Sequence, residues 1–193
     1  MARLLDKVNV IDVEATCWEG NPPLGQKREI IEVGITVVDI RTLELLDNVG
    51  YIVRPQQSKV SEFCTRLTSI TQAEVDKSRW VYATICKELK KRYKTKDRPW
   101  VSWGDYDRNQ FQRQSNEGNT PYPFGPTHIN LKNLFALSEM WPKEDGMYPA
   151  LNKFGLKLKG FHHRGRDDSY NIAMLFVEYL RRYREHKNFE IVT

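Results

Sequence analysis

The sequence predicts an α/β fold in which a mixed five-stranded sheet is flanked by helices. Three runs rich in β-branched residues come first, at Val8–Val13, Ile30–Val38 and Leu43–Val53. Two further short apolar runs, Trp100–Trp103 and His128–Leu131, then alternate with segments of helical periodicity. Strands followed by alternating helices and strands are typical of a mixed sheet covered by helices.

The elements follow from local signals along the chain. Turn residues at 39–42 make the second and third strands a hairpin, and the polar, proline-rich residues 16–28 form a loop after the first strand. Apolar residues at helical spacing predict most of the helices. In chain order we expect helices at Ser61–Arg66, Thr71–Asp76, Arg79–Tyr93, from about Asp107 to Gln114, around Leu134, Leu137 and Met140, at Pro149–Phe154 and at Asp168–Tyr183.

Length and composition limit the class of protein. With 193 residues, 40% of them hydrophobic, the chain fits one domain over 1–193. It shows neither an apolar stretch near the roughly 20 residues that span a bilayer nor a signal peptide, so we expect no membrane partner. Its three separated cysteines favour the reducing cytoplasm.

A formal charge of +5 suits an anionic partner such as nucleic acid. Two stretches hold much of this charge, and we interpret each as a solvated helix face. They contain Lys87, Lys90, Lys91, Arg92, Lys94, Lys96 and Arg98, and Arg181, Arg182, Arg184 and Lys187.

Two acids at the end of the first strand suggest a metal site. Side chains alternate across a strand, so Asp12 and Glu14 project on the same face. Their repulsion is relieved by a divalent cation, and carboxylate oxygens suit magnesium or manganese. Two solvated acids at a strand end are the alternative interpretation.

Further acids follow the fourth strand and open the last helix. Asp105 and Asp107 come directly after Trp100–Trp103, and the segment 162–168 contains two histidines followed by two aspartates. Because sites gather at the carboxyl ends of strands in open α/β sheets, these acids can meet Asp12. Such a cluster can hold two divalent ions for phosphoryl transfer, with a histidine as general base. Taken singly, the later acids could instead cap helices or complement helix dipoles.

The ordered motifs resemble those of the DEDDh exonucleases, which have a ribonuclease H-like fold. The resemblance runs from about Val8 to Tyr183 and is closest to the subgroup of the three-prime histone mRNA exonuclease, its Eri-1 relatives and the bacterial KapD-like proteins. The segments that carry it are 12–17 (DVEATC), 19–23 (EGNPP), 29–32 (EIIE), 53–55 (VRP), 63–64 (FC), 67–68 (LT) and 70–72 (ITQ), with Tyr-Asp and His-x4-Asp later in the chain.

This resemblance implies a role for each matching residue. Asp12, Glu14, Asp107 and Asp168 are implied as metal ligands and His163 as the general base. By spacing alone, the third motif fits both His162 with Asp167 and His163 with Asp168, and the family's x-x-Asn-Ile-Ala pattern after the acid selects the second pair. Asp105 remains the alternative to Asp107 as the acid of the second motif. The residues implied in substrate binding are Thr16, Phe63, Leu67 and Tyr106, with Arg164 adding a phosphate contact.

The implied activity is a 3′–5′ exonuclease that uses two Mg²⁺ or Mn²⁺ ions to release nucleoside 5′-monophosphates from single-stranded nucleic acid 3′ ends, RNA favoured over DNA. A regulatory or scaffold protein that keeps the fold and binds an unknown protein partner is the alternative from another class. A DNA proofreading exonuclease is the third.

Overall fold

The computed structural model describes residues 4–190, with side chains through residue 187. Residues 1–3 and 191–193 of the predicted 1–193 domain lie outside the described residues. In chain order the elements are β1 (Lys7–Ala15), β2 (Ile30–Asp39), β3 (Leu45–Ile52), α1 (Glu62–Thr68), α2 (Gln72–Asp76), α3 (Tyr82–Tyr93), β4 (Trp100–Ser102), α4 (Tyr106–Glu117), β5 (His128–Asn130), α5 (Leu131–Ser138), α6 (Met147–Lys153) and α7 (Gly165–Glu190).

The five strands form one sheet in the order β3-β2-β1-β4-β5. The first three pair antiparallel, whereas β4 runs parallel to both β1 and β5. The mixed five-stranded sheet flanked by helices that the sequence predicts is therefore confirmed. Because β1 and β4 are parallel neighbours, their carboxyl ends lie at one edge of the sheet.

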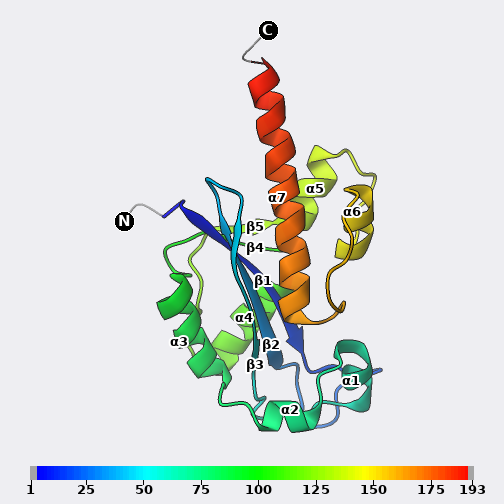
Figure 1. The fold of residues 1–193 in the computed structure, drawn as a ribbon. Coiled ribbons are helices and arrows are strands. Elements are labelled where there is room, and N and C mark those ends of the chain that lie inside the picture. Colours follow the sequence, from blue (N-terminus) through cyan, green and yellow to red (C-terminus); the bar gives the residue numbers. More distant parts are fainter. Residues whose placement is uncertain (1–3, 191–193) are drawn as a thin grey trace.

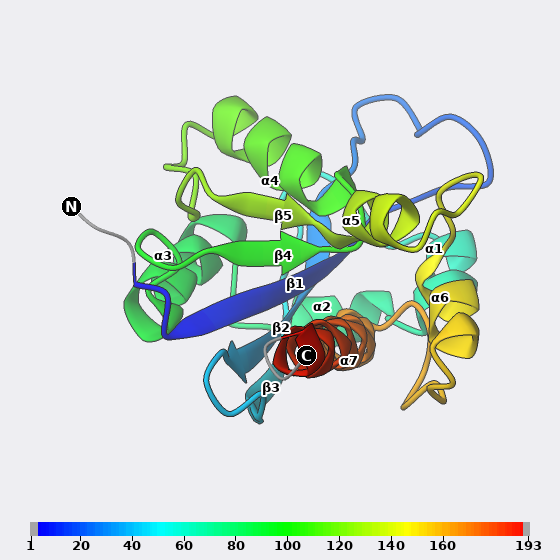
Figure 2. The same ribbon diagram turned by 90° about the horizontal axis from the view of Figure 1, so that it is seen from above.

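Helices cover both faces of the sheet (Figures 1 and 2). The α3 and α4 helices pack on one face, and α5, α6 and α7 pack on the other. In Figure 1 the carboxyl end of β1 and the first turn of α7 lie at the same end of the sheet, close to α1. This arrangement brings together motifs that are about 150 residues apart in the sequence.

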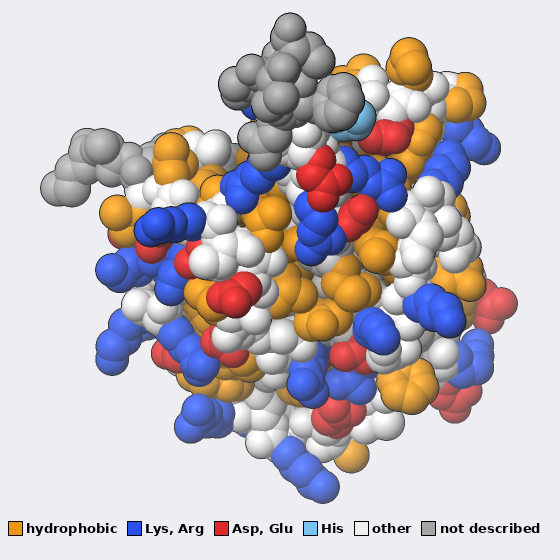
Figure 3. Space-filling model, turned by 45° about the horizontal axis from the view of Figure 1, so that its top comes forward, with side chains coloured by type: hydrophobic (Ala, Val, Ile, Leu, Met, Phe, Trp, Pro, Cys, Tyr) orange, Lys and Arg blue, Asp and Glu red, His pale blue; other side chains and the backbone are white. Residues whose placement is uncertain are grey.

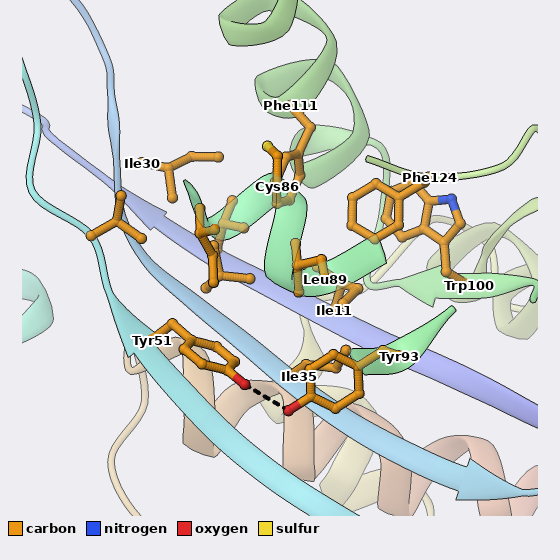
Figure 4. Close-up of a cluster of buried hydrophobic side chains, with 14 of the residues drawn as sticks. Ile11, Ile30, Ile35, Tyr51, Cys86, Leu89, Tyr93, Trp100, Phe111 and Phe124 are labelled. Carbon is orange, nitrogen blue, oxygen red and sulfur yellow. Dashed lines mark hydrogen bonds between the residues drawn. The ribbon is translucent and has the colours of Figure 1, made fainter. Parts of the chain in front are cut away.

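Aromatic side chains fill the core on the α3 and α4 face (Figure 4). Trp100 stacks on Phe124 with ring centroids 4.2 Å apart, and the hydroxyls of Tyr51 and Tyr93 lie 2.9 Å apart within hydrogen-bond distance. Phe111 of α4 is fully buried in the same cluster. This packing fixes α4, whose first turn contributes to the site described below.

Several helix boundaries differ from the predictions, among them those of the last helix and of the helix around Met140. The last helix begins at Gly165, three residues before the predicted Asp168, because Glu32 accepts hydrogen bonds from its first backbone N–H groups. The helix predicted to include Met140 ends at Ser138, and Met140 adopts a φ of 52° beyond it. Leu137 and Met140 are 80% and 88% exposed, so neither packs in the core.

Charged side chains are spread over the face of the molecule that Figure 3 shows. Lys and Arg side chains alternate there with acidic ones instead of forming one basic patch. In the second basic stretch, Arg181 and Arg182 both pair with Glu178. Within residues 4–190, no helix combines the length and the apolar character that crossing a membrane requires.

Candidate active site

Strand β1 supplies the first two acids. Asp12 lies opposite Gly34 and Glu14 opposite Glu32 in the β1–β2 ladder, and Asp12 and Glu14 share one face of the strand. Both side chains are half-buried and line a cleft of about 290 Å³ at the carboxyl end of β1. The predicted alternation therefore places both acids on the wall of one cleft.

Helix α4 supplies the third acid. Asp107 is 3% exposed, lines the cleft and accepts a 2.9 Å hydrogen bond from the backbone N–H of Val13. Asp105, the alternative acid of this motif, instead pairs with Arg108 at 2.9 Å and accepts a hydrogen bond from Asn130. The structure brings Asp107 to the cleft and leaves Asp105 outside it.

Helix α7 supplies the fourth acid. Asp168 is 4% exposed, and its carboxylate accepts a 2.8 Å hydrogen bond from the backbone N–H of His163. One carboxylate oxygen from each of Asp12, Glu14 and Asp168 lies within 4.8 Å of the other two. Asp167 accepts from the backbone N–H of Phe161 at 2.8 Å and does not line the cleft. The spacing ambiguity of the third motif is thus resolved geometrically in favour of Asp168 lying in the cleft.

A fifth acid, Glu32, holds the end of α7 in place. It is 1% exposed and accepts hydrogen bonds from the backbone N–H groups of Gly165 at 2.9 Å and Arg166 at 3.4 Å. Gly34 allows this approach, since a Cβ there would overlap the carbonyl of Gly165. Sequence reasoning missed Glu32, although an acid in the otherwise apolar run 30–38 was a usable signal.

Burial and mutual repulsion raise the pKa values of the four acids. Burial, followed by the charges of the neighbouring carboxylates, raises the pKa of Asp12 well above its ordinary value and that of Glu14 to about 8. Burial also raises the pKa of Asp107 to about 7 and, less strongly, that of Asp168. When such carboxylates ionise together they repel one another, and a divalent cation between them would offset this repulsion.

Two adjacent histidines stand at the mouth of the cleft. His163 lines it, and burial, followed by the neighbouring His162, lowers the pKa of His163 and so favours a neutral ring that can accept a proton. The two rings stack with centroids 4.0 Å apart. His162, which sequence reasoning did not assign to the site, places Nδ1 3.0 Å from a carboxylate oxygen of Asp168.

The residues expected to bind substrate occupy different surroundings. Tyr106 lines the cleft and remains 47% exposed, as a residue that stacks on a base requires. Phe63 and Leu67 lie on α1 and are not among the residues that line this cleft, so their role stays a prediction. Trp103 and Met147 line the cleft and were not predicted.

Thr16 and Arg164 both bond to other groups of the protein. The Thr16 hydroxyl is fully buried, donating to the carbonyl of Lys27 and accepting from the N–H of Glu29, so it holds the loop together and does not face the cleft. The Arg164 guanidinium lies 3.2 Å from Glu32 and 3.5 Å from Glu74. Two carboxylates thus pair with Arg164, and its role as a phosphate contact stays a prediction.

Comparison with known proteins identifies the family. A family model described as Exonuclease (RNase_T) matches residues 9–176. The chain belongs to this exonuclease family. It also superimposes on the nuclease domain of 3′hExo, a DEDDh family member bound to rAMP, with a TM-score of 0.84, 31% identity and 94% of each chain covered. The DEDDh resemblance and the fold are therefore confirmed.

Curated relatives of this exonuclease are longer proteins. Human 3′-5′ exoribonuclease 1 is 33% identical over 91% of this chain and 53% of its own length. The 3′-5′ exonuclease Snipper of Drosophila melanogaster is 27% identical over 90% of this chain and 69% of its own length. The chain thus spans about half the length of the human relative. Pop2p of S. pombe, solved in a Mg²⁺- and Mn²⁺-bound form, shares the fold with a TM-score of 0.67 and 14% identity.

Proposed function

We propose that this exonuclease hydrolyses single-stranded RNA from the 3′ end and releases nucleoside 5′-monophosphates, using divalent metal ions. The observation that carries the proposal is the convergence of Asp12, Glu14, Asp107, Asp168 and His163 on one cleft. The names of the relatives, which include 3′-5′ exoribonucleases, support this direction and substrate.

The donor set fits Mg²⁺ or Mn²⁺. Three of the four acids offer oxygens within 4.8 Å of one another, and the pKa values of Glu14 and Asp107 are raised, so a bound cation would favour their ionised forms. Asp12, Glu14, Asp107 and Asp168 would hold the ions, and we propose two. When bound, such ions stabilise the attacking and leaving oxygens of a phosphoryl displacement.

The remaining residues position the substrate and move the proton. His163 lies in the cleft with a lowered pKa, so its neutral ring can take the proton of the attacking water. The exposed ring of Tyr106 can stack on the terminal base, a contact that tolerates every base. Glu32 holds the first turn of α7 and therefore the positions of His163 and Asp168. The reducing cytoplasm suits the three free thiols, and we propose it as the location.

The proposal is tested by incubating the purified protein with 5′-labelled single-stranded RNA, or with DNA of the same sequence, in Mn²⁺, Mg²⁺ or EDTA. We expect RNA to shorten from its 3′ end in either metal, with no shortening in EDTA or with an Asp12→Ala variant. Faster loss of the DNA strand would move the assignment to DNA proofreading chemistry. Intact strands under every condition would reject the exonuclease and favour the scaffold alternative.

A further inference from the structure

An exposed segment between α6 and α7 leads directly to the cleft. In residues 156–161 the leucines face inward and pack in the core, whereas Lys157, Lys159 and Phe161 are exposed. The Phe161 side chain is 76% exposed and immediately precedes His162, which lines the cleft. We call the three exposed side chains, Lys157, Lys159 and Phe161, the basic-aromatic strip.

The backbone of this strip is held firmly by α7. The fully buried Asn171 accepts from the N–H of Lys159 and donates to its carbonyl, each at 2.9 Å. Asp167 accepts from the N–H of Phe161 at 2.8 Å, and Gly160, with a φ of 71°, leaves room for that carboxylate. The exposed ring of Phe161 is therefore presented by an ordered backbone, which lowers the entropic cost of binding through it.

The charge of the strip suits a polyanion. Among the ion pairs of the described residues, none includes Lys157 or Lys159. Asp167, the acid beside Phe161, is half-buried and turned to the backbone.

We propose that the basic-aromatic strip binds the single strand on the 5′ side of its terminal nucleotide. Phe161 stacks on a base while Lys157 and Lys159 contact backbone phosphates, the combination by which proteins grip single strands without reading sequence. This inference rests on the proposed exonuclease function, since it supposes that the 3′ end enters the cleft. It adds a second substrate contact, so longer strands should be held better than dinucleotides.

Binding in EDTA tests the strip without strand degradation. Fluorescence anisotropy with a 12-nucleotide RNA across a range of salt concentrations should show that the double variant Lys157→Gln/Lys159→Gln loses about 1.4 from its log–log salt slope, at roughly 0.7 per phosphate contact of a single strand. The matched control Lys87→Gln/Lys91→Gln removes two exposed lysines of α3, on the opposite face of the sheet, and should keep the wild-type slope.

Phe161 is tested by three substitutions. Phe161→Ala should weaken binding of the 12-nucleotide RNA by about 5- to 150-fold, the range expected for one stacked base. Phe161→Trp should retain wild-type affinity, because tryptophan also stacks on a base. Phe161→Leu should bind as weakly as the alanine variant, because neither leucine nor alanine has an aromatic ring. Equal affinities for the alanine, leucine and wild-type proteins would overturn the stacking contact.

Turnover in Mn²⁺ locates the effect along the strand. The strip variants should raise KM for the 12-nucleotide RNA far more than for a dinucleotide, with a smaller change in kcat. Equal losses on both lengths would place the residues at the terminal nucleotide and overturn the proposal. If the wild-type protein hydrolyses neither strand, the proposed function fails, whereas the anisotropy measurement still decides whether the strip binds RNA.

Discussion

Replacing Glu14 with glutamine should stabilise the metal-free protein at pH 8. Burial and the neighbouring carboxylates raise the pKa of Glu14 from 4.5 to about 8, and no hydrogen bond to another described residue involves its side chain. Because the pKa is raised in the folded state, the stability is fully present below pH 4.5 and is lost as the pH rises toward 8. Glutamine keeps the shape of the side chain and cannot ionise.

The size of the effect follows from the pKa shift. At about 1.4 kcal/mol per pKa unit, the rise from 4.5 to about 8 corresponds to roughly 5 kcal/mol, of which about 4 kcal/mol applies at pH 8, where Glu14 is half-ionised. Glu14 faces the cleft, and water screens part of its charge, so we expect about half of this, ~2 kcal/mol. For a domain of this size, ~2 kcal/mol corresponds to a rise in Tm of about 4–8 °C.

Thermal unfolding followed by circular dichroism in EDTA measures this difference. We expect Glu14→Gln to melt above wild type at pH 8 and within about 2 °C of it at pH 4.5, where the gain is small. Added Mn²⁺ should stabilise wild type more than the variant, because the variant lacks a ligand. A lower Tm for the variant in EDTA at pH 8 would refute the claim that the ionised carboxylates of the cleft destabilise the metal-free protein.

Three further predictions concern the base, the support of α7 and pH. His163→Ala should lower kcat by about 10²–10⁴-fold while RNA affinity in EDTA stays near wild type, and retained turnover would remove His163 from the mechanism. Glu32→Ala should lower the free energy of unfolding by about 1–3 kcal/mol in urea titrations, because the backbone N–H groups of Gly165 and Arg166 lose their buried acceptor; an unchanged free energy of unfolding would contradict this. Metal-free wild type should lose stability between about pH 4 and pH 8 as Asp107 and Glu14 ionise, so constant unfolding midpoints in EDTA across this range would contradict the raised pKa values.

Local sequence rules predicted the parts of the site that depend on one element at a time. The period of a strand places Asp12 and Glu14 together, and turn residues and β-branched runs locate all five strands. Contacts between distant segments were beyond such rules. Glu32 reaches α7 across about 130 residues of sequence, Arg164 finds two acids on other elements, and Thr16 turns its hydroxyl toward a loop backbone.

Local spacing and long-range contacts also divide the prediction of the acid after β4 and of the histidine and acid at the start of α7. Sequence spacing left Asp105 and Asp107 as alternatives because both follow β4 directly. The hydrogen bond from the N–H of Val13 to Asp107 separates them, and it depends on the parallel pairing of β1 with β4. His162 was likewise ambiguous by spacing, and only the fold shows its Nδ1 beside Asp168.

The most direct test of the account compares neighbouring acids that differ in position and not in chemistry. RNA shortening in Mn²⁺ would be measured for Asp107→Asn beside Asp105→Asn, and for Asp168→Asn beside Asp167→Asn. Because Asp107 and Asp168 line the cleft and Asp105 and Asp167 do not, we predict that the Asp107 and Asp168 variants lose the activity. The Asp105 and Asp167 variants should stay within about tenfold of wild type, a rise of at most about 1.4 kcal/mol in activation free energy. Full activity of the Asp107 or Asp168 variant would contradict the claim that this cleft carries the hydrolysis.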